Sequence, residues 1–219
     1  MENTDHISSH DRFAATYDEQ AKEFESHGHD ILFGLCYEYI NSGDSILDLG
    51  IGTGLSSANF AKAGLSVTGL DGSSGMLEEC RKKGFATELK QYDITGVPFP
   101  YPENSFSHVI CCGVFHFFGD LVPIIEEVCR ILKPGGVFAF ATAFLTEEEA
   151  GGGQENIPDH KTFPTAWGIS IYKHSDRYIK QIAETLRLTI LKQQKVLIFS
   201  GDKNAGDILF KGYVVRKGG

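Results

Sequence analysis

The sequence is poor in features that would indicate a secreted, membrane-embedded or metal-binding protein. It contains five cysteines in 219 residues, an odd number with no Cys-x-x-Cys spacing, which argues against a disulfide framework or a cysteine-based zinc site. No apolar stretch approaches the length that crosses a bilayer. The first six residues have neither the basic start nor the apolar core of a signal peptide. These absences predict a cytoplasmic protein with reduced cysteines and no membrane span.

Positive charge is also scarce. Lys and Arg together number 20 against 29 Asp and Glu, for a formal net charge of −9. A nucleic-acid-binding protein needs a basic surface to neutralise phosphates. The short basic run at residues 81–83 is expected to be the solvated end of a helix. The sequence therefore predicts no nucleic-acid partner.

The order of apolar runs predicts one α/β domain that covers residues 1–219. A continuous apolar run, Phe106–Gly113, is typical of a parallel strand covered on both faces. Strands that alternate with helices indicate a doubly wound parallel sheet. The last two strands flank the polar residues 200–206 and are expected to form an antiparallel hairpin. Seven strands are expected, at Ser45–Leu49, Val67–Leu70, Thr87–Tyr92, Phe106–Gly113, Val137–Ala143, Leu188–Phe199 and Asp207–Val215.

Two segments lie outside this alternation. Residues 1–43 are predicted to form a helical cap, with short amphipathic helices over residues 9–27 and a further helix at Asp30–Ile40. Residues 144–175 are too polar for a core and too long for an ordinary turn. We interpret that second segment as a lid or a substrate-binding segment.

The most informative stretch is Ile46–Gly54, a buried strand that enters a Gly-x-Gly-x-Gly turn. Gly50, Gly52 and Gly54 allow the backbone to bend sharply and to approach a ligand closely, because no Cβ is in the way. Residues 55–63 have good helix-forming character. A glycine turn between a strand and a helix is where a nucleotide-like cofactor binds.

Asp71 follows Gly50 by 21 residues and ends the second predicted strand. A carboxylate at that place accepts hydrogen bonds from the two ribose hydroxyls of an adenosine. The alternative role is to cap the next helix, which Ser73 can do equally well. We therefore favour the ribose role for Asp71.

Asp93 and Ile94 follow the third predicted strand. A carboxylate beside an apolar side chain suits an adenine, because the acid accepts from the amine while the apolar side chain packs on the ring. Met76 lies one turn into the preceding helix and either packs on the other ring face or simply fills the core.

In this arrangement the sequence resembles the class I S-adenosylmethionine (SAM) dependent methyltransferases. The resemblance covers roughly residues 10–145 and is closest to small-molecule enzymes of the ubiquinone and menaquinone pathways, whose N-terminal pattern is echoed by Phe13–Asp18. It implies a Rossmann-like, mostly parallel seven-stranded sheet, SAM as cofactor and S-adenosylhomocysteine (SAH) as product. The blocks that carry it are Ile46–Gly54, Val67–Ser73, Gln91–Thr95, Phe106–Phe118 and Leu132–Gly136. One departure is Ser107-His108, where many relatives have Phe-Asp.

The resemblance also implies roles for individual residues. Asp48 and the backbone of the glycine turn would hold the methionine part of SAM, Asp71 the ribose, and Asp93 the adenine. Cys112 would offer a backbone carbonyl to the methionine amine, and Tyr17 would close over the cofactor. The full set of expected cofactor-binding residues is Tyr17, Asp48, Gly50, Ile51, Gly52, Gly54, Asp71, Gly72, Met76, Asp93, Ile94 and Cys112.

Methyl transfer to an oxygen or an acidic carbon needs a base. His116 is the candidate, because it lies just beyond the fourth predicted strand; a structural turn histidine is the alternative reading. His160, Trp167, Tyr172 and His174 are secondary candidates for an acceptor site. The pair His27 and His29 lacks a third metal ligand at a plausible spacing, so no metal is expected.

Two other functions compete with methyl transfer to a small molecule. An NAD-dependent oxidoreductase would carry Gly-x-Gly-x-x-Gly, whereas position 55 is Leu. A SAM-binding module without catalysis is the second alternative, and the sequence does not exclude it because this class has no obligatory catalytic residue. A protein or RNA methylase is less expected, because no basic face and no Asn/Asp-Pro-Pro-Tyr motif is present. The acceptor stays open, as does the choice between monomer and homodimer.

Overall fold

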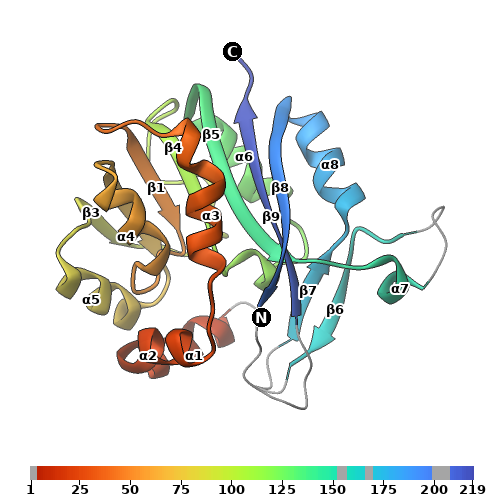
Figure 1. Cartoon of the computed structure of the whole chain (residues 1–219), viewed down its shortest axis with the longest axis horizontal. Coiled ribbons are helices and arrows are strands. Elements are labelled where there is room, and N and C mark those ends of the chain that lie inside the picture. The colour runs from red at the N-terminus through yellow and green to blue at the C-terminus, as the bar shows by residue number, and fades with distance from the viewer. Residues whose placement is uncertain (1–3, 152–156, 166–169, 199–207) are drawn as a thin grey trace.

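The chain folds around one seven-stranded sheet with helices on both faces (Figure 1). The structure, a computed structural model, describes residues 4–151, 157–165, 170–198 and 208–219. The strand order is β3-β2-β1-β4-β5-β9-β8. Neighbouring strands from β3 to β5 run parallel, whereas β9 pairs antiparallel with both β5 and β8. The strands are β1 (Ser45–Leu49), β2 (Ser66–Asp71), β3 (Glu88–Gln91), β4 (Phe106–Cys111), β5 (Leu132–Ala143), β8 (Leu188–Ile198) and β9 (Ile208–Lys217). The predicted mostly parallel, Rossmann-like sheet with an antiparallel C-terminal pair is confirmed.

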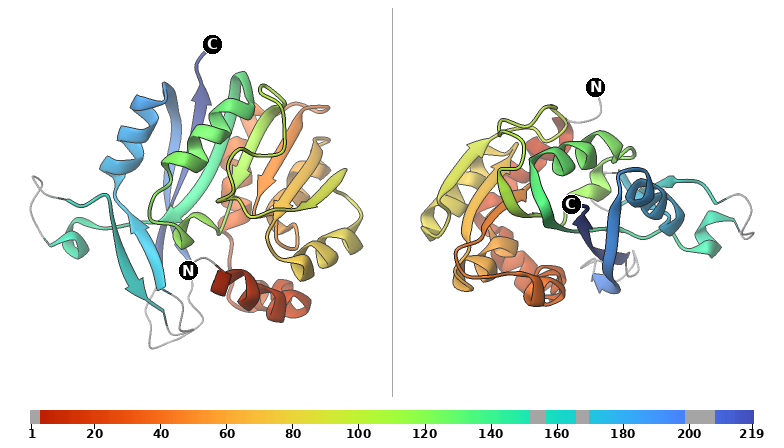
Figure 2. Two further views of the ribbon diagram at one scale, coloured as in Figure 1. Left: turned by 180° about the vertical axis from the view of Figure 1, so that it is seen from behind. Right: turned by 90° about the horizontal axis from the view of Figure 1, so that it is seen from above.

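The helices divide between the two faces. Helices α3, α4 and α5 lie in front of the sheet in Figure 1, and α6 and α8 cover the opposite face (Figure 2). Two helix starts are capped as their sequences lead one to expect: Ser73 accepts from the Met76 amide at α5, and Ser175 accepts from the Tyr178 amide at α8. The helices are α1 (Thr4–Phe13), η1 (Ala14–Thr16), α2 (Tyr17–Glu23), α3 (Gly28–Cys36), η2 (Tyr37–Tyr39), α4 (Leu55–Lys62), α5 (Ser74–Lys83), η3 (Phe115–Phe117), α6 (Val122–Ile131), α7 (Glu147–Ala150) and α8 (Asp176–Thr185).

The central strands are buried on both faces. Leu47 and Leu49 belong to the core beneath α6 and α8, whereas Ile46 belongs to the core beneath α3 and α4. Cys111 and Cys112 also face opposite sides. All five cysteines are free thiols. This two-sided burial explains why strands such as β4 read as unbroken apolar runs.

Three segments differ in detail from their sequence-based predictions. The helix expected at Asp30–Ile40 is α3 followed by the short 3₁₀ helix η2. Strand β5 begins at Leu132 and not at Val137, because Leu132 pairs with Phe106 and a register shift accommodates the Lys-Pro-Gly-Gly residues. Residues 144–175 contain α7 and an antiparallel pair, β6 (His160–Pro164) with β7 (Ser170–His174). Whether that segment acts as a lid stays a prediction.

The N-terminal helices lie at the edge of the sheet where β1, β2 and β4 end (Figure 1). Two aspartates hold them there. The Asp11 carboxylate accepts from the Ser73 hydroxyl and from the Gly75 amide. The Asp18 carboxylate accepts from the Thr53 hydroxyl and pairs with Lys83. Helices α1 and α2 therefore cover the end of the sheet at which the predicted cofactor residues converge.

Among the residues that the structure describes, no helix is both long enough and apolar enough to pass through a membrane.

Candidate functional site

The glycine turn adopts a conformation that only glycine accommodates readily. Gly50, Gly52 and Gly54 have φ values of +71°, +55° and +86°. A Cβ on Gly50 would lie 2.4 Å from a Val114 methyl carbon, so a side chain there would collide with the residues after β4. A Cβ on Gly52 would meet no atom within 4 Å. The turn thus packs against β4 on one side and leaves the backbone at Gly52 facing open space.

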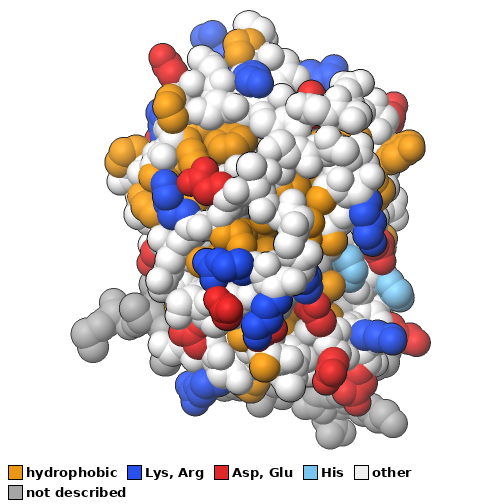
Figure 3. Space-filling model, turned by 90° about the vertical axis from the view of Figure 1, so that its left-hand side faces the viewer, with side chains coloured by type: hydrophobic (Ala, Val, Ile, Leu, Met, Phe, Trp, Pro, Cys, Tyr) orange, Lys and Arg blue, Asp and Glu red, His pale blue; other side chains and the backbone are white. Residues whose placement is uncertain are grey.

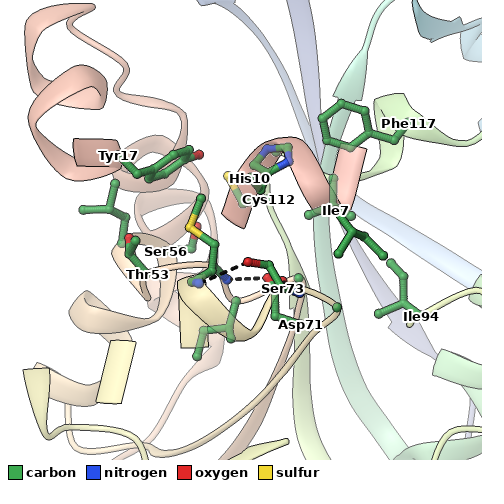
Figure 4. A pocket seen from close by; sticks show the side chains of 18 of the residues that line it. Ile7, His10, Tyr17, Thr53, Ser56, Asp71, Ser73, Ile94, Cys112 and Phe117 are labelled. Atoms are coloured by element: carbon green, nitrogen blue, oxygen red, sulfur yellow. Dashed lines mark hydrogen bonds between the residues drawn. The ribbon is translucent and has the colours of Figure 1, made fainter. Parts of the chain in front are cut away.

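This open space is a cavity at the carboxyl ends of β1, β2 and β4 (Figure 4). With its open mouth it comprises about 750 Å³. The predicted residues that line it are Tyr17, Gly50, Ile51, Gly52, Asp71, Gly72, Met76, Asp93, Ile94 and Cys112. Residues from five separate chain segments therefore meet around one cavity. Gly54 and Asp48 are not part of its lining.

Asp71 connects the cavity to the glycine turn. Its two carboxylate oxygens accept from the Gly52 amide at 2.7 Å and from the Ser73 amide at 2.8 Å. Burial raises the pKa of Asp71, and these two backbone hydrogen bonds oppose that rise. Each oxygen has a second lone pair, so the carboxylate can accept further hydrogen bonds from a ligand. Ser73, and not Asp71, provides the side-chain cap of α5.

Asp48 lies beneath the turn instead of facing the cavity. Its side chain is 1% exposed. The Ser57 hydroxyl donates to Oδ2, while Oδ1 has no hydrogen-bond partner among the described residues. Burial raises the pKa of Asp48 to about 7, because a low-dielectric environment disfavours the charged form. The structure gives Asp48 a place in the support of the turn, and its predicted contact with the cofactor stays a prediction.

The third part of the cavity pairs an exposed acid with buried apolar side chains. Asp93 is exposed, and its Oδ1 accepts from the amide and the hydroxyl of Thr95. Ile94 and Met76 are 5% and 2% exposed and also line the cavity. A carboxylate oxygen that accepts hydrogen bonds, beside two apolar side chains, is the arrangement that the sequence predicts for binding an adenine.

The cavity is completed by residues that sequence reasoning missed. Ile7 and His10 of α1 line it together with Phe117. The His10 ring lies between Tyr17 and Phe117 in Figure 4, with its centroid 5.5 Å from that of Phe117 and 6.5 Å from that of Tyr17. No local spacing marks His10 as a site residue, because its position depends on α1 folding back over the sheet.

His116, the predicted base, does not line the cavity. Its ring packs against Phe117 and Phe210, with centroids 4.1 and 5.3 Å away. The role of His116 therefore stays a prediction, and the ring lies behind Phe117.

The secondary candidates lie elsewhere. His174 is fully buried, with Nδ1 2.7 Å from the Thr142 hydroxyl and Nε2 3.1 Å from the Gly119 carbonyl oxygen. Burial lowers the pKa of His174 to about 4, so its ring is neutral. His160 and Tyr172 pack beside it. Trp167 lies outside the described residues. Within the described part of the chain, no group of three His, Cys, Asp or Glu side chains is arranged to hold a metal.

The departure at Ser107-His108 is remote from the cavity. His108 Nε2 lies 2.9 Å from an Asp44 carboxylate oxygen, and the Ser107 amide donates to the Ser45 hydroxyl. These contacts tie the beginning of β4 to the beginning of β1, at the opposite end of the strands.

Taken together, the fold and the site define a Rossmann-like domain with a nucleotide-type cavity at the carboxyl ends of its parallel strands. Residues 47–140 match the family model described as "Methyltransferase domain". This match confirms the resemblance to the class I SAM-dependent methyltransferases that was inferred from the sequence.

Individual relatives agree with this assignment. The demethylmenaquinone methyltransferase of Tropheryma whipplei is 30% identical over 97 residues, which are 44% of this chain and 41% of that protein. The malonyl-[acyl-carrier protein] O-methyltransferase of Priestia megaterium is 33% identical over 134 residues, 59% of this chain and 47% of that protein. The chain thus spans less than half the length of these curated relatives.

A solved structure shows the same fold over the whole chain. The 1,6-didemethyltoxoflavin-N1-methyltransferase of Burkholderia thailandensis, solved with its substrate and SAH, has a TM-score of 0.70 at 13% identity. The similarity covers 100% of this chain and 91% of that one.

The cofactor of this class is SAM, as predicted, and the residues present fit it. Asp71 offers a hydrogen-bond acceptor for the ribose, and Ile94 and Met76 offer apolar walls for the adenine. The backbone at Gly52 is open, so the cofactor can approach it closely.

Proposed function

We propose that this protein is an enzyme that transfers a methyl group from SAM to a small-molecule acceptor. The observation that supports this most is the convergence of ten predicted residues on one cavity. They come from the ends of β1, β2, β3 and β4 or the residues just after them, from α5 and from the N-terminal helices. When bound, SAM supplies a methyl group on a positively charged sulfur, and its transfer leaves SAH. The names of the curated relatives, which act on a menaquinone precursor and a malonyl thioester carrier, support a metabolite as acceptor.

The cavity residues divide into holding and shielding roles. Asp71 would accept from the ribose hydroxyls, and Asp93 with Ile94 and Met76 would hold the adenine. The glycine turn would present its amides to the methionine carboxylate at the start of α4. Ile7 and Phe117 would help to exclude water from the cavity, in which correct positioning of the two reactants supplies much of the acceleration.

We propose that two side chains from the N-terminal helices act on the acceptor. Burial raises the pKa of Tyr17 to about 12, so its phenol stays neutral and can donate a hydrogen bond. His10 lines the same cavity, and histidine is the side chain that most often acts as a general base. We propose that His10 removes a proton from the acceptor when the methylated atom is an oxygen or an acidic carbon.

His10→Ala is expected to lower kcat for such an acceptor by about 10²- to 10⁴-fold, with little change in SAH affinity. The measurement is kcat together with calorimetric SAH binding. His116→Ala is the matched control, and we expect it to change kcat much less because its ring lies behind Phe117. If His116→Ala is slow and His10→Ala is normal, the base is His116.

A direct test separates methyl transfer from the competing functions. Calorimetry is expected to show binding of SAM and SAH and none of NAD. Incubation with isotopically labelled SAM and a metabolite extract is then expected to yield a labelled small molecule and SAH. Binding of NAD alone would favour an oxidoreductase. Tight SAM binding with no turnover over broad acceptor panels would favour a non-catalytic module.

The surface supports a small molecule in preference to a nucleic acid. On the face shown in Figure 3, Lys and Arg side chains are interspersed with Asp and Glu side chains and do not form a basic area. We further propose a cytoplasmic location, because all five thiols are free. The choice between monomer and homodimer is open to sedimentation measurements.

A further inference from the structure

A second cavity adjoins the first, beneath α3 on the face formed by β5 and β9. With its mouth it comprises about 660 Å³. Its hollow has a simple origin in the sheet: Ala141 of β5 is paired directly with Gly212 of β9. Residues that are directly opposite in an antiparallel pair share one face, so at this pair the face carries only the Ala141 methyl group. Leu35 of α3 approaches the pair, with its Cδ1 3.5 Å from the position of a Cβ on Gly212.

This second cavity adjoins the cofactor cavity, and the two share part of their walls. The residues that line both are Tyr17, Leu55, Ser56, Cys112 and Gly113. They come from the start of α2, the start of α4 and the end of β4. A molecule in the second cavity would therefore meet the cofactor cavity at the point where Tyr17 and Cys112 lie.

The chemistry of the lining differs between the two cavities. The cofactor cavity contains the carboxylates of Asp71 and Asp93. The described lining of the second cavity contains no Asp, Glu, Lys or Arg, and most of it is apolar: Ala21, Ile31, Leu32, Leu35, Leu55, Ala141, Val196 and Phe210. Burying an unpaired charge there would be costly, so the lining disfavours an ionic ligand.

The polar groups of the second cavity are concentrated in a few side chains. Burial raises the pKa of Tyr17 to about 12 and that of Cys112 to about 11. Both are therefore neutral at physiological pH. Ser56 adds a hydroxyl at the junction, and Ser26 and His29 add polar atoms from the start of α3 and the residues before it. These groups can orient a neutral polar atom without supplying a counter-charge.

We infer that the second cavity holds the methyl acceptor, and that the acceptor is an uncharged, largely apolar small molecule. Its body lies against α3 and the Ala141–Gly212 pair, and its reacting polar atom is directed to the junction at Tyr17 and Cys112. This inference rests on the proposed methyltransferase function and adds the class of acceptor and its place. It also gives His29 a place in the acceptor site.

The experiment uses the full chain saturated with SAH, and two probes of similar shape but different charge. The probes are 1-naphthol, which is neutral at pH 7, and 1-naphthoate, which is an anion. Binding is measured by calorimetry or by ligand-observed NMR. We expect 1-naphthol to bind with one site per chain and 1-naphthoate to bind at least about tenfold more weakly. Failure to bind 1-naphthol, or a preference for the anion, would overturn the inference.

Substitutions then locate the bound probe. Ala141→Leu fills the hollow and is expected to weaken 1-naphthol binding about tenfold or more, with SAH affinity unchanged. Thr185→Leu is the matched control, because it enlarges a side chain that lines a separate cavity beside α8. We expect it to leave the affinities for 1-naphthol and SAH unchanged. Equal binding of 1-naphthol by wild type and Ala141→Leu would place the probe elsewhere and contradict the inference.

A second variant guards against misfolding of the first. Gly212→Ala adds one methyl group whose nearest neighbour is 3.5 Å away, so the fold is expected to tolerate it. We expect a loss of 1-naphthol affinity of about threefold or more, and an unchanged affinity would contradict the inference. SAH binding is measured separately in every variant. Absence of SAH binding in the wild type would refute the proposed function, whereas the naphthol results test the acceptor class.

Discussion

Replacing Asp71 with alanine is expected to weaken SAH binding by about 100-fold or more. The substitution removes two sets of hydrogen bonds at once. It holds the Gly52 and Ser73 amides on its two oxygens, and it is the predicted acceptor for the ribose hydroxyls. Hydrogen bonds to a charged group contribute about 1.5–3 kcal/mol each, and a loss of about 3 kcal/mol corresponds to roughly 100-fold in affinity. Calorimetric titration with SAH measures the effect.

Two variants show whether Asp71 acts directly. Asp71→Asn keeps one acceptor oxygen and is expected to give an intermediate loss. Asp93→Ala removes a carboxylate that is exposed to solvent, so its effect is expected to be smaller than that of Asp71→Ala. An SAH affinity of Asp71→Ala equal to that of wild type would remove Asp71 from the site.

The cofactor cavity was largely predictable because it is built from strand ends. In a parallel sheet the carboxyl ends of neighbouring strands meet at one edge. Asp71 and Asp93 were predicted from their places at the ends of strands, their spacing from the glycine turn and the hydrogen bonds that a carboxylate accepts, and both line the cavity. The same reasoning did not distinguish a side chain at the strand end from one inside the strand. Asp48 precedes the turn by two residues, and the alternation of the strand buries it beneath the turn.

What sequence reasoning missed depends on contacts between distant segments. His10 reaches the cavity only because α1 is held against α5 through Asp11 and Ser73, 62 residues apart. The second cavity arises from the pairing of Ala141 with Gly212, which no local pattern reveals. His116 lies in the short 3₁₀ helix η3 and packs against Phe117, so its predicted role as a base stays a prediction. Local spacing locates a strand end; it does not determine which way a loop side chain turns.

Replacing Asp48 with asparagine is expected to remove a large part of the pH dependence of stability. The pKa of Asp48 is about 7 in the folded protein, against an ordinary value of 3.8. The folded state therefore holds a proton that the unfolded state releases, so the contribution of Asp48 to stability is fully present below pH 3.8 and is lost as the pH rises to 7. Between pH 5 and pH 8 this amounts to about 3 kcal/mol. Urea denaturation of the cofactor-free protein at both pH values measures it.

The comparison between variants isolates Asp48 from the other titrating groups. Asp48→Asn is expected to show a difference in unfolding free energy between pH 5 and pH 8 that is about 3 kcal/mol smaller than in wild type, whatever constant offset the buried amide adds. Ser57→Ala is expected to raise the pKa of Asp48 further. The Ser57 hydroxyl lowers the pKa of Asp48 by donating to Oδ2, so its removal should extend the loss of stability to higher pH. If wild type and Asp48→Asn respond identically to pH, Asp48 is ionised in the folded protein, and a buried donor must then reach Oδ1.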